Sequence, residues 1–114
     1  MRKEIKVKDK IICYEHGIVL CGKVEKITPF RPCAFSSRTA KRINIAVEKT
    51  FPNHGFTYYD VVDDEAHHVK VCHYKKSLWL KLREHVERRR MVDAMEGYRL
   101  LGKIHDILTK AREV

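Results

Sequence analysis

The chain has 114 residues, of which 44% are hydrophobic and 34% charged, and its formal net charge is +9. This length fits one domain, or a small domain with an appendage, and no apolar run reaches the ~18–20 residues of a membrane-spanning helix. The first residues lead into no apolar stretch, and four cysteines in such a chain are typical of reduced thiols. We therefore expect a cytoplasmic protein without a secretory signal.

Residues 7–27 predict two antiparallel strands joined at a glycine. Aliphatic and β-branched residues supply both strands, and Gly17 can take the positive φ that a hairpin turn needs. Gly22 lies within the return strand, where a glycine usually marks a bulge or a sharp bend. Because such bends let a short sheet curl onto itself, this stretch favours a small, strongly bent β-barrel.

The same stretch resembles a known class of barrel. The pattern is Val7-x-Asp9-x-Ile11-Ile12, followed by His16-Gly17-Ile18 and Gly22-x-Val24. It resembles the opening of SH3-like barrels of the KOW and Tudor type, and it is more specifically similar to the RNA-polymerase-interacting domain of CarD-type transcription factors. Those domains tend to begin with a Gly-Asp turn, two β-branched residues, a tyrosine and His-Gly. Here Lys8 replaces the glycine and Tyr14 comes one position late. The resemblance covers about a fifth of the chain and implies a partner in the transcription machinery.

Further strands are expected after this hairpin. Residues 28–39 contain two prolines and two serines and predict a long loop. Residues 43–48 alternate with period two, which predicts a strand with Ile43, Ile45 and Val47 on its inward side. The remaining predicted elements are a turn at 52–55, a strand at 56–62, an acidic turn at 63–65 and a fifth strand at 68–74.

The periodicity becomes helical in the last third of the chain. Ser77 is expected to cap a helix whose apolar stripe contains Leu78, Leu82, His85, Val86 and Met91. Asp93 and Glu96 predict a capping box and hence a second helix. The apolar positions of that helix are Met95, Tyr98, Leu101, Ile104, Ile107 and Leu108. One kinked helix over residues 77–112 is the alternative.

The expected fold class is α+β. A five-stranded, bent, antiparallel SH3-like β-barrel is predicted for residues 1–75. A basic C-terminal helix or helical hairpin, packed on the barrel or extending from it, is predicted for residues 76–114.

Basic and aromatic residues interleave in and after the predicted loop. Arg31, Arg38, Lys41 and Arg42 crowd this region, together with Phe35. Basic side chains bind phosphates and aromatic rings stack on bases, so the pattern predicts a nucleic-acid-binding loop. A solvated loop whose phenylalanines tuck under the barrel is the alternative.

The predicted helices are basic as well. Residues 75–114 carry eleven Lys or Arg against six Asp or Glu, and Arg88, Arg89 and Arg90 are consecutive. We expect these arginines to bind nucleic acid too, although successive residues lie ~100° apart around a helix, so the three cannot share one face. An ordinary solvated helix is the alternative. Trp79 is expected to pin the helix to the barrel, rather than to wedge into DNA as a tryptophan of the CarD-type family does.

Histidines and cysteines do not form a recognisable metal or catalytic motif. His67, His68, Cys72 and His73 fit no common zinc spacing, and neighbouring side chains in a strand point to opposite faces. Cys13 and Cys21 lie four residues either side of Gly17, so we expect them opposite each other as buried thiols. We expect no metal, no other cofactor and no catalytic residue.

The leading hypothesis is a non-enzymatic regulatory module that binds DNA or RNA, or that binds RNA polymerase or another nucleic-acid enzyme. The second is a protein-interaction module, such as a small inhibitor of a cellular enzyme, with the C-terminal helix as the binding surface or as a homodimer seam. A small hydrolase or nuclease that uses the histidines is the third. No membrane partner is expected.

Overall fold

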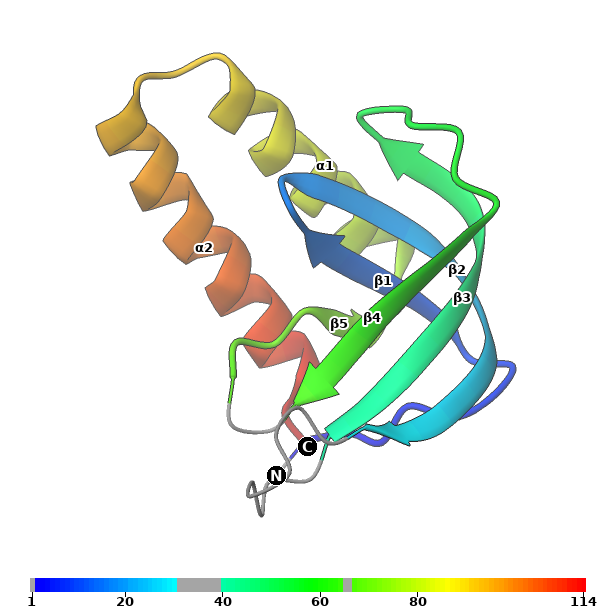
Figure 1. Ribbon diagram of the computed structural model, residues 1–114. Coiled ribbons are helices and arrows are strands. Elements are labelled where there is room, and N and C mark those ends of the chain that lie inside the picture. Colours follow the sequence, from blue (N-terminus) through cyan, green and yellow to red (C-terminus); the bar gives the residue numbers. More distant parts are fainter. Residues whose placement is uncertain (1, 31–39, 65–66) are drawn as a thin grey trace.

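In a computed structural model the chain forms one antiparallel sheet followed by two helices (Figure 1). The structure describes residues 2–30, 40–64 and 67–114. The elements are β1 (Lys10–Glu15), β2 (Ile18–Phe30), β3 (Ala40–Phe51), β4 (Tyr58–Asp64), β5 (Val71–His73), α1 (Lys76–Arg90) and α2 (Ala94–Arg112). The strand order is β4-β3-β2-β1-β5, and each neighbouring pair is antiparallel. The predicted α+β class and the five strands are confirmed.

The predicted closure into a barrel is wrong, because the sheet stays open. β4 and β5 are its two edges, and β5 has only three residues. Arg112 of α2 lies between these edges. Its guanidinium donates to the carboxylate of Asp63 in β4, at 3.0 and 3.2 Å, and to the carbonyl of Val71 in β5, at 3.2 Å. A side chain thus bridges the edges where strand pairing would close a barrel.

The first hairpin is confirmed, with a register one residue away from the expected one. His16 and Gly17 form a two-residue turn in which both have positive φ, 54° and 78°. Such a turn matches the right-handed twist of the two strands. Because the turn is centred between these two residues rather than on Gly17, Cys13 pairs with Leu20 and not with Cys21. The two cysteines belong to the cores on opposite faces of the sheet.

The bulge predicted at Gly22 is also confirmed. The register between β2 and β3 shifts between Cys21 and Gly22, and again between Val24 and Lys26. A Cβ added at Gly22 would overlap the carbonyl oxygen of Ala46 in β3. The two backbones therefore approach each other more closely here than any side chain allows, and β2 bends at this point.

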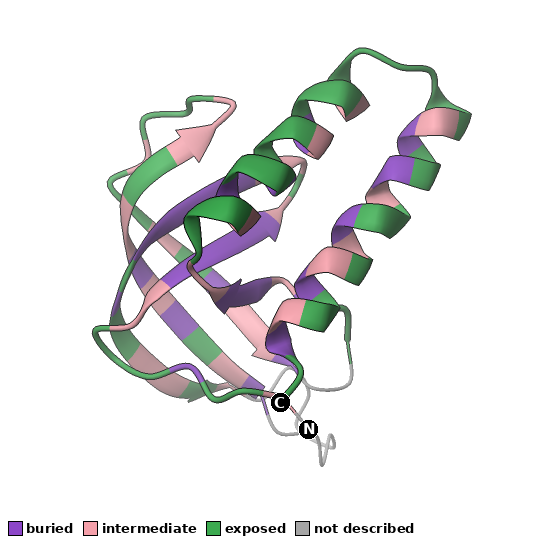
Figure 2. Cartoon of the chain, turned by 180° about the vertical axis from the view of Figure 1, so that it is seen from behind, coloured by how far each residue is buried: buried purple, intermediate pink, exposed green. Residues whose placement is uncertain are grey.

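Two hydrophobic clusters cover the two faces of the sheet, and both include residues of β1. Toward the helices, the buried side chains of Ile12 and Cys72 pack with Trp79, Leu82, Ile104 and Leu108. Figure 2 shows buried positions along the strands and along both helices. The burial of Trp79 confirms that it holds α1 against the sheet. On the other face the bent sheet encloses a second cluster, which includes Ile11, Leu20, Ile43, Ile45 and Val61. The predicted inward side of residues 43–48 is confirmed, since Val47 packs against this cluster.

The helical region forms two helices rather than one kinked helix. Asp93 is the N-cap of α2, and its Oδ1 accepts a hydrogen bond from the amide of Glu96 at 3.0 Å. The carboxylate of Glu96 pairs with Arg99. The prediction for Ser77 is wrong, because Lys75 is the N-cap of α1 and no side chain caps this end.

The predicted apolar stripes fail at the turn between the helices. In α2 the buried residues are Gly97, Leu100, Ile104, Leu108 and Arg112. Met91 is 81% exposed, Met95 84% and Tyr98 74%. Met91 is the C-cap of α1, in the turn between the helices (Figure 1). Met95 and Tyr98 lie about 160° and about 100° around α2 from the buried Gly97, so they are off the face that packs on the sheet.

Two predicted boundaries also shift. Asp63 and Asp64 end β4 instead of forming a turn, and the fifth strand contains only Val71–His73. Asp63 is kept in the strand by its ion pair with Arg112, a contact that lies outside any local pattern.

Replacing Gly22 by alanine should lower the free energy of unfolding by about 3 kcal/mol or more, because β2 and β3 must separate to admit the Cβ. Gly102 offers a matched control in α2, since a Cβ there meets nothing within 4 Å. Gly102→Ala should instead stabilise the protein by up to about 1 kcal/mol. Urea unfolding followed by circular dichroism measures both, and a Gly22→Ala protein as stable as the parent would contradict the close approach.

Replacing Arg112 by methionine should cost about 3–5 kcal/mol, because it leaves Asp63 without its buried partner. Arg99→Met removes an exposed ion pair and should change stability little. The double variant Arg112→Met/Asp63→Leu should recover part of the loss, which a double-mutant cycle in urea quantifies. Equal losses for Arg112→Met and Arg99→Met would mean that the bridge between the sheet edges contributes nothing.

Candidate nucleic-acid interface

The predicted nucleic-acid-binding residues do not gather on one surface of the described chain. Lys41 and Arg42 lie at the start of β3, near the chain termini (Figure 1). Arg88, Arg89 and Arg90 end α1 at the opposite end of the molecule. Outside the described residues lie Arg31, Phe35 and Arg38.

Lys41 and Arg42 have different surroundings. Lys41 Nζ lies 3.8 Å from Glu4 Oε1, so its charge is partly compensated. The guanidinium of Arg42 lies 4.8 Å from the centroid of the Phe30 ring, in a cation–π contact. Arg42 is exposed and forms no ion pair within the described part of the chain.

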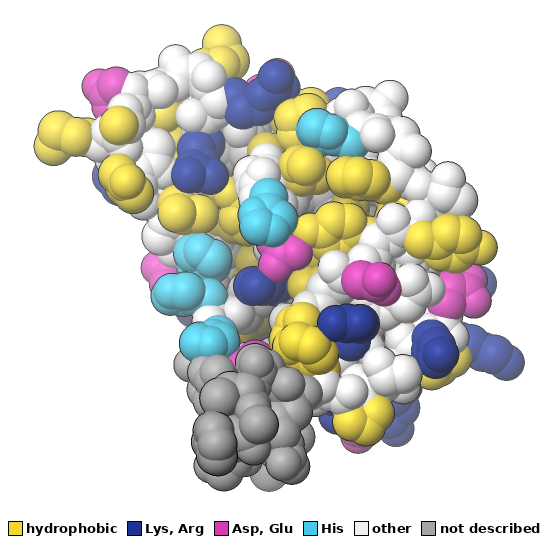
Figure 3. Space-filling model, viewed as in Figure 1, with side chains coloured by type: hydrophobic (Ala, Val, Ile, Leu, Met, Phe, Trp, Pro, Cys, Tyr) yellow, Lys and Arg dark blue, Asp and Glu magenta, His cyan; other side chains and the backbone are white. Residues whose placement is uncertain are grey.

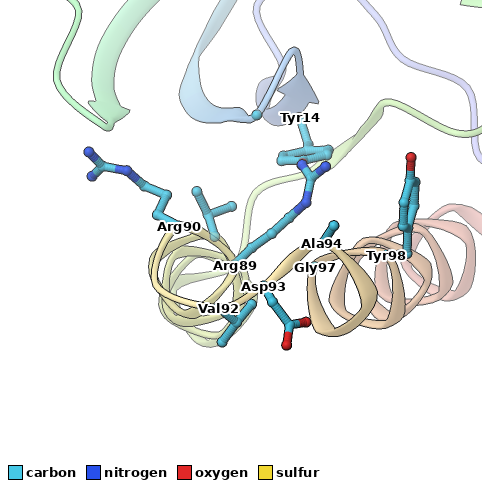
Figure 4. Close-up of a pocket in the computed structure, with 10 residues that line it drawn as sticks. Tyr14, Arg89, Arg90, Val92, Asp93, Ala94, Gly97 and Tyr98 are labelled. Atoms are coloured by element: carbon cyan, nitrogen blue, oxygen red, sulfur yellow. The ribbon is translucent and has the colours of Figure 1, made fainter.

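The three consecutive arginines point in different directions, as their spacing on a helix requires. Arg88 and Arg90 are exposed, whereas Arg89 is half-buried. Arg89 Nη1 donates to the hydroxyl of Tyr14 in β1 at 2.8 Å (Figure 4). Arg89 thus connects α1 to the first hairpin.

A different set of basic residues lines one groove beside the start of α1. This groove has a volume of about 370 Å³, and its basic residues are Lys3, Lys75, Lys81 and Lys110. No carboxylate is among its lining residues, which otherwise include Ser77, Leu78 and Ile107. None of the four lysines forms an ion pair with a described residue. We term this feature the lysine groove.

The fold brings these lysines together from three separate segments. The amide of Lys3 donates to the carbonyl of Arg112 at 2.6 Å, which places the N-terminal segment beside the end of α2. Lys75 and Lys81 belong to the start of α1, and Lys110 belongs to the last turn of α2. Because α1 and α2 run antiparallel (Figure 1), the start of one helix lies beside the end of the other.

The start of α1 adds to the positive potential of the lysine groove. The first turn has no acidic residue and no side-chain cap. The first intrahelical bond of α1 runs from the amide of Trp79 to the carbonyl of Lys75, so the preceding amides have no helical acceptor. Unpaired amides and the helix dipole favour an anion at such an end.

His73 also lines the lysine groove, and it is hydrogen-bonded to a carboxylate. Its Nε2 lies 2.9 Å from Asp9 Oδ2. The hydrogen bonds from the Lys6 amide and from His73 hold the pKa of Asp9 below its usual value of 3.8. Asp9 therefore stays ionised at neutral pH and has His73 as its partner, whereas the four lysines of the groove have no carboxylate partner among the described residues.

The lysine groove adjoins a smaller cavity through Lys3. This cavity, of about 230 Å³, is lined by Lys3 and also by Arg2, Lys41 and Arg112. Two carboxylates compensate its charges, since Glu4 pairs with Lys41 and Asp63 with Arg112. Lys41, predicted to bind nucleic acid, thus lies in the cavity next to the groove, although its own charge is partly compensated.

The chain matches no protein family, no curated protein and no solved structure. The resemblance to SH3-like barrels and to the CarD-type domain therefore depends on residues 7–24 alone. Within the described residues, no three His, Cys, Asp or Glu side chains are arranged to hold a metal ion. Neither described helix is both long and apolar enough to cross a membrane.

The described cysteines are buried free thiols. They are Cys13, Cys21 and Cys72. Burial raises the pKa of Cys13 far above its usual value and that of Cys72 to about 12. These thiols are therefore protonated at neutral pH and behave as small apolar residues.

Histidines pack beside the Arg89–Tyr14 contact. The ring of His105 in α2 stacks on that of His68, with centroids 4.6 Å apart, and meets the Tyr14 ring edge-on at 6.2 Å. Burial, together with the charges of His68 and Arg89, lowers the pKa of His105 below its usual value of 6.5. Asp106 and a hydrogen bond with the Val69 backbone act in the opposite direction without reversing the shift.

The protein should be less stable at pH 5.0 than at pH 7.5. His105 binds a proton more readily in the unfolded chain, so its contribution is complete above about pH 6.5 and is lost as the pH falls through its lower folded pKa. Asp9 and Glu15, with usual pKa values of 3.8 and 4.5 lowered on folding, lose their contributions only at lower pH. Urea midpoints at both pH values should differ less for His105→Gln than for the parent. His54→Gln, at an exposed position, is the control. An unchanged difference in His105→Gln would contradict this assignment.

Proposed function

We propose that the protein binds nucleic acid through the phosphate backbone, with the lysine groove as the main contact, as a non-enzymatic accessory of a nucleic-acid machine. One observation carries the proposal. Four lysines from three separate segments line a single groove that has no carboxylate in its lining.

Phosphate diesters fit this arrangement better than a single small anion does. Lysine is a flexible point charge, suited to successive phosphates along a strand rather than to one fixed geometry. Each neutralised phosphate releases a counterion, so several lysines together give strong and salt-dependent attraction. The net charge of +9 supports the same class of partner.

Phosphate contacts position a protein on nucleic acid without reading its sequence. The proposal therefore implies weak sequence preference at the lysine groove. The resemblance of residues 7–24 to the CarD-type domain suggests a transcription complex as the setting. That suggestion is independent of the groove.

Affinity for a generic 20-base-pair duplex should fall steeply as salt rises. Replacing Lys75, Lys81 and Lys110 by glutamine should flatten the plot of log K against log salt by about one unit per lost contact. The matched control replaces three exposed lysines elsewhere, Lys6, Lys23 and Lys26, by glutamine, with the same change in net charge. Fluorescence anisotropy from 20 to 200 mM salt measures the slopes. The same titration with a labelled single strand tests binding to single-stranded nucleic acid.

A third variant compares the lysine groove with the site predicted from the sequence, by replacing Arg38, Lys41 and Arg42 with glutamine. A larger loss of slope in this variant than in the groove variant would move the interface to the loop. Equal small decreases in the salt slope for the groove variant and the control variant would indicate attraction by net charge alone. No binding of either probe at 20 mM salt would exclude the proposal.

A further inference from the structure

The turn between α1 and α2 carries exposed apolar side chains at the end of the molecule remote from the lysine groove. Met91, Met95 and Tyr98 are 81%, 84% and 74% exposed, and Val92 is 37% exposed. We term these four residues the apolar tip. Figure 3 shows hydrophobic side chains gathered around the start of α2, with basic side chains beside them. Burial against a partner is the usual explanation of such a cluster.

A cavity opens between the apolar tip and the first hairpin. It has a volume of about 390 Å³, and its lining includes Tyr14, Val86, Arg89, Gly97 and Tyr98 (Figure 4). Gly97 adds no side chain, so the start of α2 leaves room there. The cavity is therefore a concave, partly aromatic site next to a convex apolar one.

The charged residues that line this cavity are Arg89, Arg90 and Asp93, and of the two arginines only Arg89 is half-buried. Arg89 forms no ion pair with any described residue. Its bond to the Tyr14 hydroxyl fixes the guanidinium in place and leaves other N–H groups available. The carboxylate of Asp93, which also lines the cavity, points away from Tyr14 and Arg89 (Figure 4) and accepts from the Glu96 amide.

A fixed, half-buried guanidinium without a counterion is complementary to a carboxylate, which it can bind through two parallel hydrogen bonds. The methionines beside it are unbranched and adapt to the shape of an apolar partner. We infer that the apolar tip and this cavity form a docking site for an acidic protein segment. One Asp or Glu of that segment pairs with Arg89, and a neighbouring large apolar side chain packs on Met95 and Tyr98.

Other occupants fit the site less well. A second copy of the chain, related by a two-fold axis, would bring the like charges of Arg88, Arg89 and Arg90 together. Nucleic acid would satisfy Arg89 but would leave the methionines without an apolar partner. The apolar face of α2 itself is unavailable, because Leu100, Ile104 and Leu108 are fully buried within the chain. Of the C-terminal helix face predicted from the sequence, the docking site uses only Met95 and Tyr98, which are exposed, and it does not depend on the lysine groove.

The test is a selection of random 12-residue displayed peptides on the immobilised full-length protein. We expect enriched peptides to share an acidic residue next to a large apolar one. A synthetic labelled copy of the most enriched peptide should bind at least tenfold more weakly to Met95→Ser/Tyr98→Ser and to Arg89→Gln, with Arg89→Lys intermediate. Both residues of the double variant are exposed, so the variant keeps its core. Leu80→Ser, at an exposed apolar position of α1, is the control and should bind like the parent.

Each alternative occupant has its own readout. Enriched peptides without acidic residues, equal binding to the double variant, or no enrichment would overturn the inference. Concentration-dependent self-association that Met95→Ser/Tyr98→Ser abolishes would assign the tip to a second copy. A flatter salt slope for duplex binding in Arg89→Gln would assign it to nucleic acid. The variant with Lys75, Lys81 and Lys110 replaced by glutamine should bind the peptide like the parent. That result would show that peptide binding does not depend on the lysine groove.

Discussion

The guanidinium of Arg112 joins four parts of the molecule that strand pairing leaves apart. It is 4% exposed, and it bonds to the carboxylate of Asp63, to the carbonyl of Val71 and, through Nε, to the carbonyl of Lys3 at 3.0 Å. These bonds tie the end of α2 to both sheet edges and to the N-terminal segment. Burying an ion pair costs desolvation free energy, so its contribution is more to a unique arrangement than to net stability.

That arrangement determines the surface on which the proposed function depends. Lys3 lies beside Lys110 because the N-terminal segment runs along the end of α2, which the Arg112 bonds fix. The open sheet allows the end of α2 to lie between the sheet edges, with the N-terminal segment beside it. A closed barrel would pair β4 with β5 and leave no gap for the end of the helix. The charge of the lysine groove therefore follows from a feature of the core.

Local features were predictable from the sequence, and long-range ones were not. The first hairpin, the bulge at Gly22 and the cap at Asp93 depend on neighbouring residues, and all three were predicted. The strand partner of Cys13 could be predicted only with the turn type known, because one residue more or less in a turn shifts the whole register of the hairpin. Arg112 follows an apolar stripe and resembles any solvated basic residue. No local pattern connects Lys3 with Lys110, which lie at opposite ends of the chain. The predicted apolar stripe included Met95 and Tyr98, whereas the buried face of α2 follows Gly97, Leu100, Ile104 and Leu108. Several apolar stripes can be drawn on this helix, and only the packing against the sheet selects one.

The two ends of the described chain are paired with each other. Arg2 and Glu113 form an antiparallel bridge, and the amide of Lys3 bonds to the carbonyl of Arg112. Because these two ends lie side by side, a short linker could join them without moving either one. The described chain is therefore suited to circular permutation. New ends placed in the exposed segment between β3 and β4, at residues 53–55, would interrupt neither the sheet nor the two helices.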